Sequence, residues 1–363
     1  MPLKTTAGNH GAAAKGRGAT INPEGRFEKW ARGETDDGWF QEPEDGPSKP
    51  KTVIAIERAK SIISRNDSPD IGFNQSLNPY RGCGIGCPYC YARPSHAYLG
   101  LSPGLDWETR LSAKTNAAEV LREELAKPGY RCETIVIGVN TDAYQPIERE
   151  HRITRSVLEV MLETRHPVGL ITKSALIERD IDLLSQLARE RLVNVTITVV
   201  TLDHGISRYL EPRASAPARR LLAIRRLSEA GIPVNVNVAP VIPYLTDSEL
   251  ESILEATAEA GARTASYTLL RLPWEVKEVF RAWLEERFPL KAAHVMSRVH
   301  EMRGGRDNDP NFGSRMKGQG LFAELLKQRF AKGLERFGLT RGDYAVDASK
   351  FTPPSRHGQA RLF

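Results

Sequence analysis

The sequence predicts an α/β protein whose core is a partial (β/α)6 barrel, placed between a disordered N-terminal segment and a helical C-terminal extension. Two observations support this fold class. Short runs rich in Val, Ile and Thr alternate with amphipathic helical patterns, and from Thr134 onward successive runs start roughly 25–40 residues apart. One helix between two strands implies a right-handed crossover and a parallel sheet. Six such units make an open barrel, because a closed eight-unit barrel needs a longer chain.

The expected elements follow one another along residues 70–290. Their β-branched content and bounding turn residues predict strands at Ile71–Gln75, Thr134–Val139, Val168–Thr172, Val195–Val200, Val234–Ala239 and Thr264–Leu270. The helical period predicts helices at Ala117–Ala126, Arg155–Thr164, Asp180–Arg191, Ala216–Ala230, Asp247–Ala260 and Glu275–Arg287. We expect Asp180 and Asp247 to be N-caps, and Gly231 and Gly261 to end helices. Functional residues are expected at the carboxyl ends of the strands.

Charge divides the 363-residue chain into three predicted parts. Residues 1–50 hold 7 basic and 8 acidic residues with few apolar ones, so we expect this segment to be disordered. Residues 51–290 form the core and are neutral, with 30 residues of each sign. Residues 291–363 hold 14 basic and 7 acidic residues and account for the net charge of +6. Such an extension favours nucleic acid as a partner, or else forms a solvated face that keeps the protein soluble.

Three classes of protein are excluded by the sequence. No run of 18 apolar residues is present, so we expect no membrane span, and no apolar stretch follows Met1 as it would in a secretory signal. Four cysteines, three of them within eight positions, do not form a disulfide framework. We therefore expect a cytoplasmic protein, in which clustered thiols indicate metal or redox chemistry.

The clustered thiols are Cys83, Cys87 and Cys90, in a Cys-x3-Cys-x2-Cys loop rich in glycine. Soft thiolates select zinc, copper(I) or iron–sulfur centres. Three cysteines that hold a [4Fe–4S] cluster leave one iron open to a substrate or cofactor. The alternative is a closed zinc site with His96 as the fourth ligand. The remaining cysteine, Cys132, lies at the start of a predicted strand and is expected to be a buried structural thiol.

This loop, with Tyr89 before its third cysteine and βαβ units after it, resembles the radical S-adenosylmethionine (SAM) superfamily. The resemblance implies that Cys83, Cys87 and Cys90 bind a [4Fe–4S] cluster whose open iron is chelated by SAM. It also implies reductive cleavage of SAM to methionine and a 5′-deoxyadenosyl radical, with an electron donor such as flavodoxin or ferredoxin.

A narrower resemblance covers residues 75–272. Four short motifs at expected strand ends are similar to spore photoproduct lyase and its relatives labelled DNA-repair photolyases: Thr141-Asp142, Thr172-Lys173, Glu211-Pro212 and Val238-Ala239-Pro240. One departure matters. The lyase has a cysteine just before its Ser-Asp pair that donates a hydrogen atom to the product radical, whereas Gly138–Asp142 contains none. The resemblance therefore does not imply photoproduct lyase activity by that route.

The resemblance also implies roles for residues that would contact SAM. Tyr89 would pack against the adenine, Thr141 and Asp142 would accept from the ammonium, and Lys173 would pair with the carboxylate. Further polar candidates are Thr198 and Arg213. Two structural alternatives stay open: Lys173 as a snorkelling surface lysine, and Arg213 as a loop arginine beside Glu211.

The C-terminal extension carries two further features. Its apolar pattern predicts an amphipathic helix at Leu321–Phe337. The chain ends in Gln359-Ala360-Arg361-Leu362-Phe363, which resembles the peptide by which bacterial repair and replication proteins dock on the sliding clamp through Gln359, Leu362 and Phe363.

Together these features predict a radical SAM enzyme that acts on a large substrate, with nucleic-acid repair or modification as the leading hypothesis. Two alternatives remain at this stage. One is a zinc-binding nucleic-acid adaptor without catalysis, and the other is a radical SAM enzyme that acts on RNA or protein.

Overall fold

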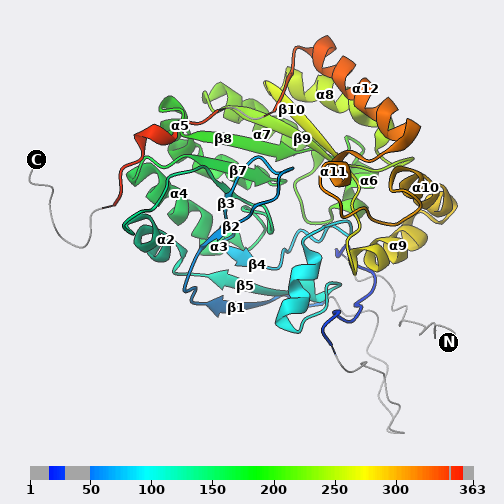
Figure 1. The fold of residues 1–363 in the computed structure, drawn as a ribbon, viewed down its shortest axis with the longest axis horizontal. Helices are drawn as coiled ribbons and strands as arrows, with labels where there is room; N and C mark the ends of the chain where they lie inside the picture. Colours follow the sequence, from blue (N-terminus) through cyan, green and yellow to red (C-terminus); the bar gives the residue numbers. More distant parts are fainter. Residues whose placement is uncertain (1–15, 29–49, 343–344, 355–363) are drawn as a thin grey trace, which may run out of the picture.

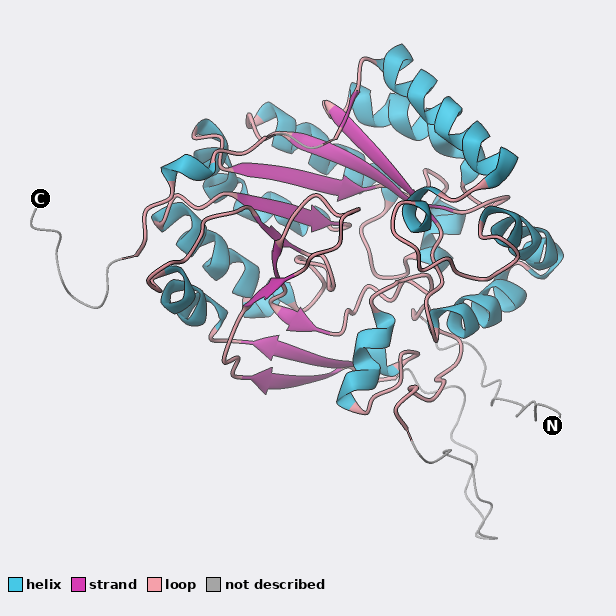
Figure 2. Ribbon diagram, viewed as in Figure 1, coloured by secondary structure: helices cyan, strands magenta, loops and turns pink. Residues whose placement is uncertain are grey.

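The computed structural model describes residues 16–28, 50–342 and 345–354 (Figures 1 and 2). The terminal Gln359, Leu362 and Phe363, proposed to dock on a sliding clamp, lie outside these residues. No helix in the described ranges is both long and apolar enough to cross a membrane.

An eight-stranded sheet forms the centre of the protein, in the order β11-β10-β9-β8-β7-β6-β3-β2. All neighbouring strands are parallel except β2 and β3, so the sheet contains the six parallel strands predicted for a partial barrel and a seventh, the edge strand β11, which was not predicted. The sheet stays open between its edge strands β2 and β11. The strands are β2 (Ile63–Arg65), β3 (Gln75–Leu77), β6 (Ile135–Ile137), β7 (Val168–Thr172), β8 (Val193–Thr198), β9 (Val234–Val241), β10 (Thr264–Leu269) and β11 (Thr340–Arg341).

A row of helices covers one face of this sheet (Figure 1). The apolar faces of these helices and the buried side chains of the strands form one core. Successive side chains of each strand point to opposite faces of the sheet, so the strands contribute apolar residues to both faces. The C-terminal helix α12 packs against α8 at the end of the row. The helices are α2 (Ala117–Leu125), α4 (Ile153–Glu163), α5 (Ile181–Arg189), α7 (Pro217–Glu229), α8 (Leu250–Glu259) and α12 (Gly320–Phe337).

A second group of elements lies around the carboxyl ends of the strands. Helices α9 (Val276–Arg287) and α10 (Pro289–Met302) pack against each other in a separate apolar cluster that also contains two cysteines. Short helical segments complete this group: η1 (Arg93–Leu99), α1 (Asp106–Thr109), α3 (Glu148–His151), η2 (Ala175–Asp180), α6 (His204–Leu210), η3 (Asp247–Glu249) and α11 (Ser314–Lys317).

A small second sheet was not predicted. Its order is β1-β5-β4, with β1 (Val53–Glu57) parallel to β5 (Arg110–Lys114) and β4 (Tyr80–Arg81) antiparallel to it. Strand β1 is largely exposed, so its sequence lacks the apolar alternation that identifies a half-buried strand. Only the pairing with residues 57 positions away specifies this strand.

Several predicted boundaries are wrong. The first strand begins at Gln75 rather than Ile71, because residues 66–74 form the turn of a hairpin in which the Asn66 amide donates to the Asn74 carbonyl at 2.9 Å. Asp180 precedes α5 but caps nothing with its side chain, which pairs with Arg155 and Arg179 instead. Asp247 starts η3, so α8 begins only at Leu250.

Part of the segment expected to be disordered is packed. Residues 16–28 are described, and Gly18 and Ala19 are buried against the cysteine loop. The Gly18 and Ala19 amides donate to the Glu108 carboxylate at 3.0 and 2.8 Å. Composition did not indicate this packing, because backbone donors and small residues make the contacts.

Candidate active site

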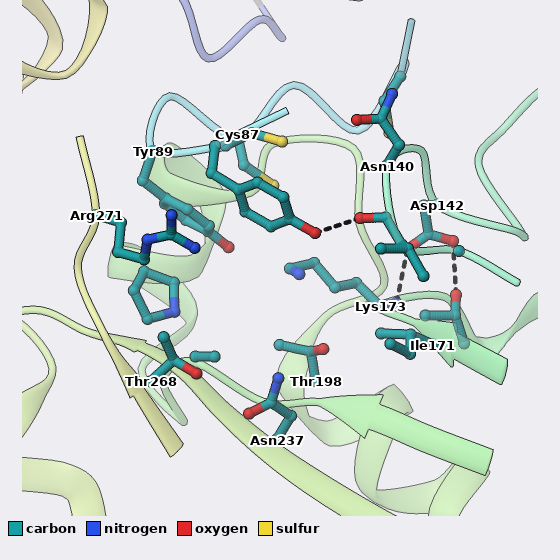
Figure 3. A pocket seen from close by; sticks show the side chains of 18 of the residues that line it. Cys87, Tyr89, Asn140, Asp142, Ile171, Lys173, Thr198, Asn237, Thr268 and Arg271 are labelled. Atoms are coloured by element: carbon teal, nitrogen blue, oxygen red, sulfur yellow. Dashed lines mark hydrogen bonds between the residues drawn. The ribbon is translucent and has the colours of Figure 1, made fainter. Parts of the chain in front are cut away.

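A cavity of about 330 Å³ lies at the carboxyl ends of β6 to β10 and is closed on one side by the cysteine loop (Figure 3). Parallel strands bring residues that are distant in sequence to this one edge. The lining includes most of the residues that the sequence singled out: Cys83, Cys87, Tyr89, Cys90, Asp142, Lys173 and Thr198.

The cysteine loop is held in a tight fold by two glycines with positive φ angles and by hydrogen bonds between the Gln145 side chain and the loop backbone. Gly82 and Gly86 take positive φ angles of 69° and 79°, which side chains rarely adopt. The buried Gln145 side chain accepts from the Gly84 amide at 2.8 Å and donates to the Gly82 carbonyl at 3.2 Å. The loop therefore presents three thiols to the cavity from a fixed backbone.

A buried ion pair supports the loop from behind. Arg93 and Glu108 are both fully buried and pair with each other. Arg93 also donates from Nε to the Cys87 carbonyl at 2.8 Å and from Nη1 to the Gly104 carbonyl at 2.8 Å. A buried charge pair is tolerated only when its remaining donors and acceptors are satisfied, and here the backbone satisfies them.

Asp142 and Lys173 meet at the ends of β6 and β7 (Figure 3). The Asp142 carboxylate accepts from the Thr172 hydroxyl at 2.7 Å, the Lys173 amide at 2.8 Å and the Tyr144 amide at 2.8 Å. A carboxylate has about four acceptor positions, so roughly one is left for a ligand. Asp142 therefore fixes the backbone from which Lys173 enters the cavity.

The Lys173 ammonium points into the cavity and makes no hydrogen bond or ion pair within the described part of the chain (Figure 3). Burial lowers the pKa of Lys173, but Cys87, Glu211 and Asp142 raise it, and the pKa lies above its ordinary value. The residue is thus a charged cation held in a partly enclosed site, not a snorkelling surface lysine.

Tyr89 belongs to a buried polar network below the cysteine loop. Its hydroxyl donates to Glu211, and Arg220 pairs with the same carboxylate. Arg220 also donates to the Thr198 carbonyl at 2.9 Å, which connects the loop to the end of β8. Burial, Cys87 and Glu211 raise the pKa of Tyr89, so its hydroxyl stays protonated as a donor. Glu211 was predicted only as part of a strand-end motif, and Arg220 was not predicted as a site residue.

Two predicted SAM contacts do not line the cavity. The Thr141 side chain is buried, and its hydroxyl donates to the Tyr80 carbonyl at 3.4 Å. Arg213 is exposed, and a Cβ on Gly84 would lie 3.7 Å from its guanidinium, on the other side of the loop. The structural alternative considered for Arg213, an ordinary loop arginine, fits its position.

The cavity lining also includes polar residues that were not predicted as site residues, among them Asn237, Thr268 and Arg271. Asn237 follows an alternating Val-Asn pattern in β9, which was a signal for polar side chains on one face of a buried strand. Burial and the neighbouring Arg315 lower the pKa of Arg271.

His96 is not placed as a fourth metal ligand. Its Nε2 is hydrogen-bonded to the Arg110 carbonyl at 3.0 Å, and its ring packs edge-on against Trp107 at 5.0 Å. Cys132 is half-buried, lies outside the cavity lining, and burial raises its pKa to about 12.

The donor set fits an iron–sulfur cluster. Burial raises the pKa of Cys83 to about 12, so a soft metal centre is needed to hold the thiol as a thiolate in this site. No three His, Cys, Asp or Glu side chains in the described ranges converge on a position for one ion. A cuboidal cluster takes one thiolate per iron, so its ligands need not converge on one point.

Comparison with known proteins agrees with this site. Residues 77–257 match the radical SAM superfamily. The chain is 34% identical over 275 residues to an uncharacterised protein of Mycobacterium tuberculosis strain H37Rv. The aligned region covers 75% of this chain and 76% of that protein. It is 27% identical over 239 residues to an uncharacterised protein of Methanocaldococcus jannaschii, covering 66% of this chain and 85% of that protein.

Solved structures share the fold. Spore photoproduct lyase complexed with a dinucleoside spore photoproduct has a TM-score of 0.56 and 15% identity, over 79% of this chain and 81% of that chain. A double mutant of the lyase with bound AdoMet and the dinucleoside has a TM-score of 0.55 and 16% identity, over 80% and 81%. The chain belongs to the radical SAM superfamily of enzymes, whose cofactors are a [4Fe–4S] cluster and SAM.

Proposed function

We propose that Cys83, Cys87 and Cys90 hold the [4Fe–4S] cluster and that SAM binds beside it in the 330 Å³ cavity. The observation that supports this proposal is the meeting of three thiols and an unpaired ammonium in one cavity at the strand ends. The chemistry that these cofactors supply is one-electron cleavage of SAM to methionine and a 5′-deoxyadenosyl radical that takes a hydrogen atom from a substrate.

The residues of this chain would bind and orient SAM. Lys173 would pair with its carboxylate, because it is a charged donor without a partner in the described chain. Asp142 would offer its remaining acceptor position to the ammonium. Tyr89 would pack against the adenine, with its ring held in place by the bond of its hydroxyl to Glu211. Thr198 and Asn237 would add polar contacts from β8 and β9.

We further propose nucleic-acid repair or modification as the reaction class, with flavodoxin or ferredoxin as the electron donor. The excess of basic residues in 291–363 supports a polyanionic substrate. The likeness in fold to a lyase solved with a dinucleoside supports the same class. The loop after β6 contributes Asn140, not a cysteine, to the cavity lining, so this loop would not supply a cysteine as the final hydrogen donor.

Anaerobic reconstitution tests the ligand assignment. We expect about four irons per chain in the wild type and in the control Cys132→Ser, because Cys132 is remote from the cavity. We expect Cys87→Ser to lose most of the iron and the reductive release of 5′-deoxyadenosine. Iron content and product are measured by colorimetric assay and chromatography. Equal iron in wild type and Cys87→Ser would rule out the assignment.

A further inference from the structure

The cavity contains a second unpaired cation. Arg271 follows β10, and Figure 3 shows its guanidinium directed into the cavity from the side opposite Asp142. Its Nε is buried without a hydrogen-bond partner in the described ranges, and its Nη1 reaches only the Met316 sulfur, a weak acceptor, at 3.5 Å. A buried guanidinium nitrogen without an oxygen acceptor is costly, which indicates that a ligand supplies one.

The neighbouring carboxylates are already engaged. Asp70 pairs with Arg315 through two hydrogen bonds, at 2.7 and 2.5 Å. Asp309 accepts from the Ser314 hydroxyl and the Asn311 amide. No Asp or Glu forms an ion pair with Arg271 in the part of the chain that is described. The region around Arg271 therefore keeps a positive charge that faces the cavity.

SAM does not account for both cations. It carries one carboxylate, and Lys173 lies beside Asp142 and Cys87, on the side where the proposed SAM site is. Arg271 enters from β10, three strands away from β7 in the sheet, which is about 14 Å at the usual strand spacing. A second anionic group, brought by the substrate, would satisfy Arg271.

The wall next to Arg271 is apolar and aromatic. The Tyr91 ring centre lies 5.8 Å from the Arg271 guanidinium carbon, and the Tyr91 hydroxyl is held by the Val139 carbonyl. Ile71, Phe73 and Met316 line the same cavity. A fixed aromatic face beside a cation suits a flat base next to its phosphate.

We infer that Arg271 binds a phosphate of a nucleotide unit in the substrate, with the base placed against the Tyr91 ring. The inference rests on the proposed function and specifies its substrate class as a single strand or an unstacked nucleotide of a nucleic acid. Arg271 is thus a binding residue for the substrate, whereas Lys173 serves SAM.

Two matched variants separate the two anions. Anaerobic titrations with fluorescein-labelled 12-nucleotide single strands of DNA and RNA compare four reconstituted proteins: wild type, Arg271→Gln, Lys173→Gln and the surface control Arg122→Gln. SAM binding is measured in parallel by equilibrium dialysis. We expect Arg271→Gln to weaken oligonucleotide binding roughly ten- to a hundredfold. The slope of the logarithm of the binding constant against the logarithm of the salt concentration should become shallower by about one. We expect its SAM affinity to stay within about twofold of the wild type.

The opposite outcomes overturn the inference. If Arg271→Gln weakens SAM binding as much as Lys173→Gln and leaves oligonucleotide affinity unchanged, the residue serves the SAM carboxylate. If wild type binds neither strand, or Arg271→Gln matches Arg122→Gln in both assays, no substrate phosphate lies there. Oligonucleotide binding is measured without any turnover of SAM. A loss of oligonucleotide binding with normal iron content and SAM cleavage therefore contradicts only this inference, whereas a loss of iron or SAM cleavage contradicts the proposed function.

Discussion

At the residue scale, Glu211 joins parts of the chain that are far apart in sequence. It accepts from the Tyr89 hydroxyl, 122 positions earlier, and pairs with Arg220, and both charged side chains are 1% exposed. Arg220 in turn donates to the carbonyls of Ser215 and Thr198. One carboxylate therefore sets the position of the tyrosine beside the third cysteine relative to the end of β8.

Removing this charge should be costly. We expect Glu211→Gln to lower the free energy of unfolding by about 3–5 kcal/mol, because the Arg220 charge stays buried without its partner. The control is Glu163→Gln, which breaks an ion pair with Arg122 whose side chains are 44% and 46% exposed, and which should cost less than about 1 kcal/mol. Urea unfolding measures both. Equal losses in the two variants would contradict a buried network.

At the scale of elements, residues 16–28 act as a strap over the outer side of the cysteine loop. A Cβ on Gly18 would lie 1.7 Å from the Gly86 carbonyl oxygen, so the strap and the loop touch backbone to backbone. Arg17 fastens the same stretch, donating to the carbonyls of Glu108 at 3.0 Å and Pro50 at 2.8 Å. The strap thereby shields the side of the loop that faces away from the cavity.

We expect Gly18→Ala to displace the strap, since the new methyl group meets backbone that cannot move aside. The expected loss is about 1–3 kcal/mol of stability. Amide exchange at Gly18 and Ala19 should accelerate, and the reconstituted cluster should bleach faster in air. The control is Gly72→Ala, where nothing lies within 4 Å of the added carbon. Unchanged amide exchange in Gly18→Ala would contradict the contact.

At the scale of the whole molecule, two segments from opposite parts of the chain pack at opposite ends of the parallel strands, one at the carboxyl ends and the other at the amino ends. The strap lies at the cavity end, while residues 347–352, drawn in red at the left of Figure 1, return to the amino ends of β7 and β8. The Thr352 amide donates to the Thr164 carbonyl at 2.8 Å, and Lys350 donates to the Glu190 carbonyl at 2.7 Å. Phe351 packs edge-on against His166 at 5.2 Å.

This closure should make stability depend on pH. Burial lowers the pKa of His166 to about 4, from 6.5 in the unfolded chain. The unfolded state therefore takes up the proton first, and stability present above pH 6.5 is lost as the pH falls toward 4. The expected loss is about 3 kcal/mol.

His166→Gln should lack this part of the pH dependence, whereas the exposed control His204→Gln should keep it. Denaturant unfolding at several pH values between 4 and 7 measures the free energy of unfolding of each variant and of the wild type. Subtracting the wild-type value at each pH removes the contribution of carboxylates, which is common to both proteins. Parallel curves for wild type and His166→Gln would disprove the assignment.

Much of the fold and of the site could be predicted from the sequence, for local reasons. The strand Val168–Thr172 was predicted with its observed bounds, because a β-branched run between turn residues is specified by its own composition. Gly231 and Gly261, predicted to end helices, have φ angles of 76° and 103°. The three cysteines lie within eight positions, so their spacing alone indicated a shared centre.

The sequence by itself determined the parallel α/β core and the family, since strand patterns, helix periods and the cysteine spacing are local signals. Only the tertiary structure decided that Arg271 shares a cavity with Lys173, that Thr141 and Arg213 do not, and that residues 16–28 pack on the loop. Contacts of this kind join backbone groups and side chains that lie 31 to 249 positions apart. No local pattern encodes such pairs, because each residue is ordinary on its own and gains its role from what the fold places opposite it.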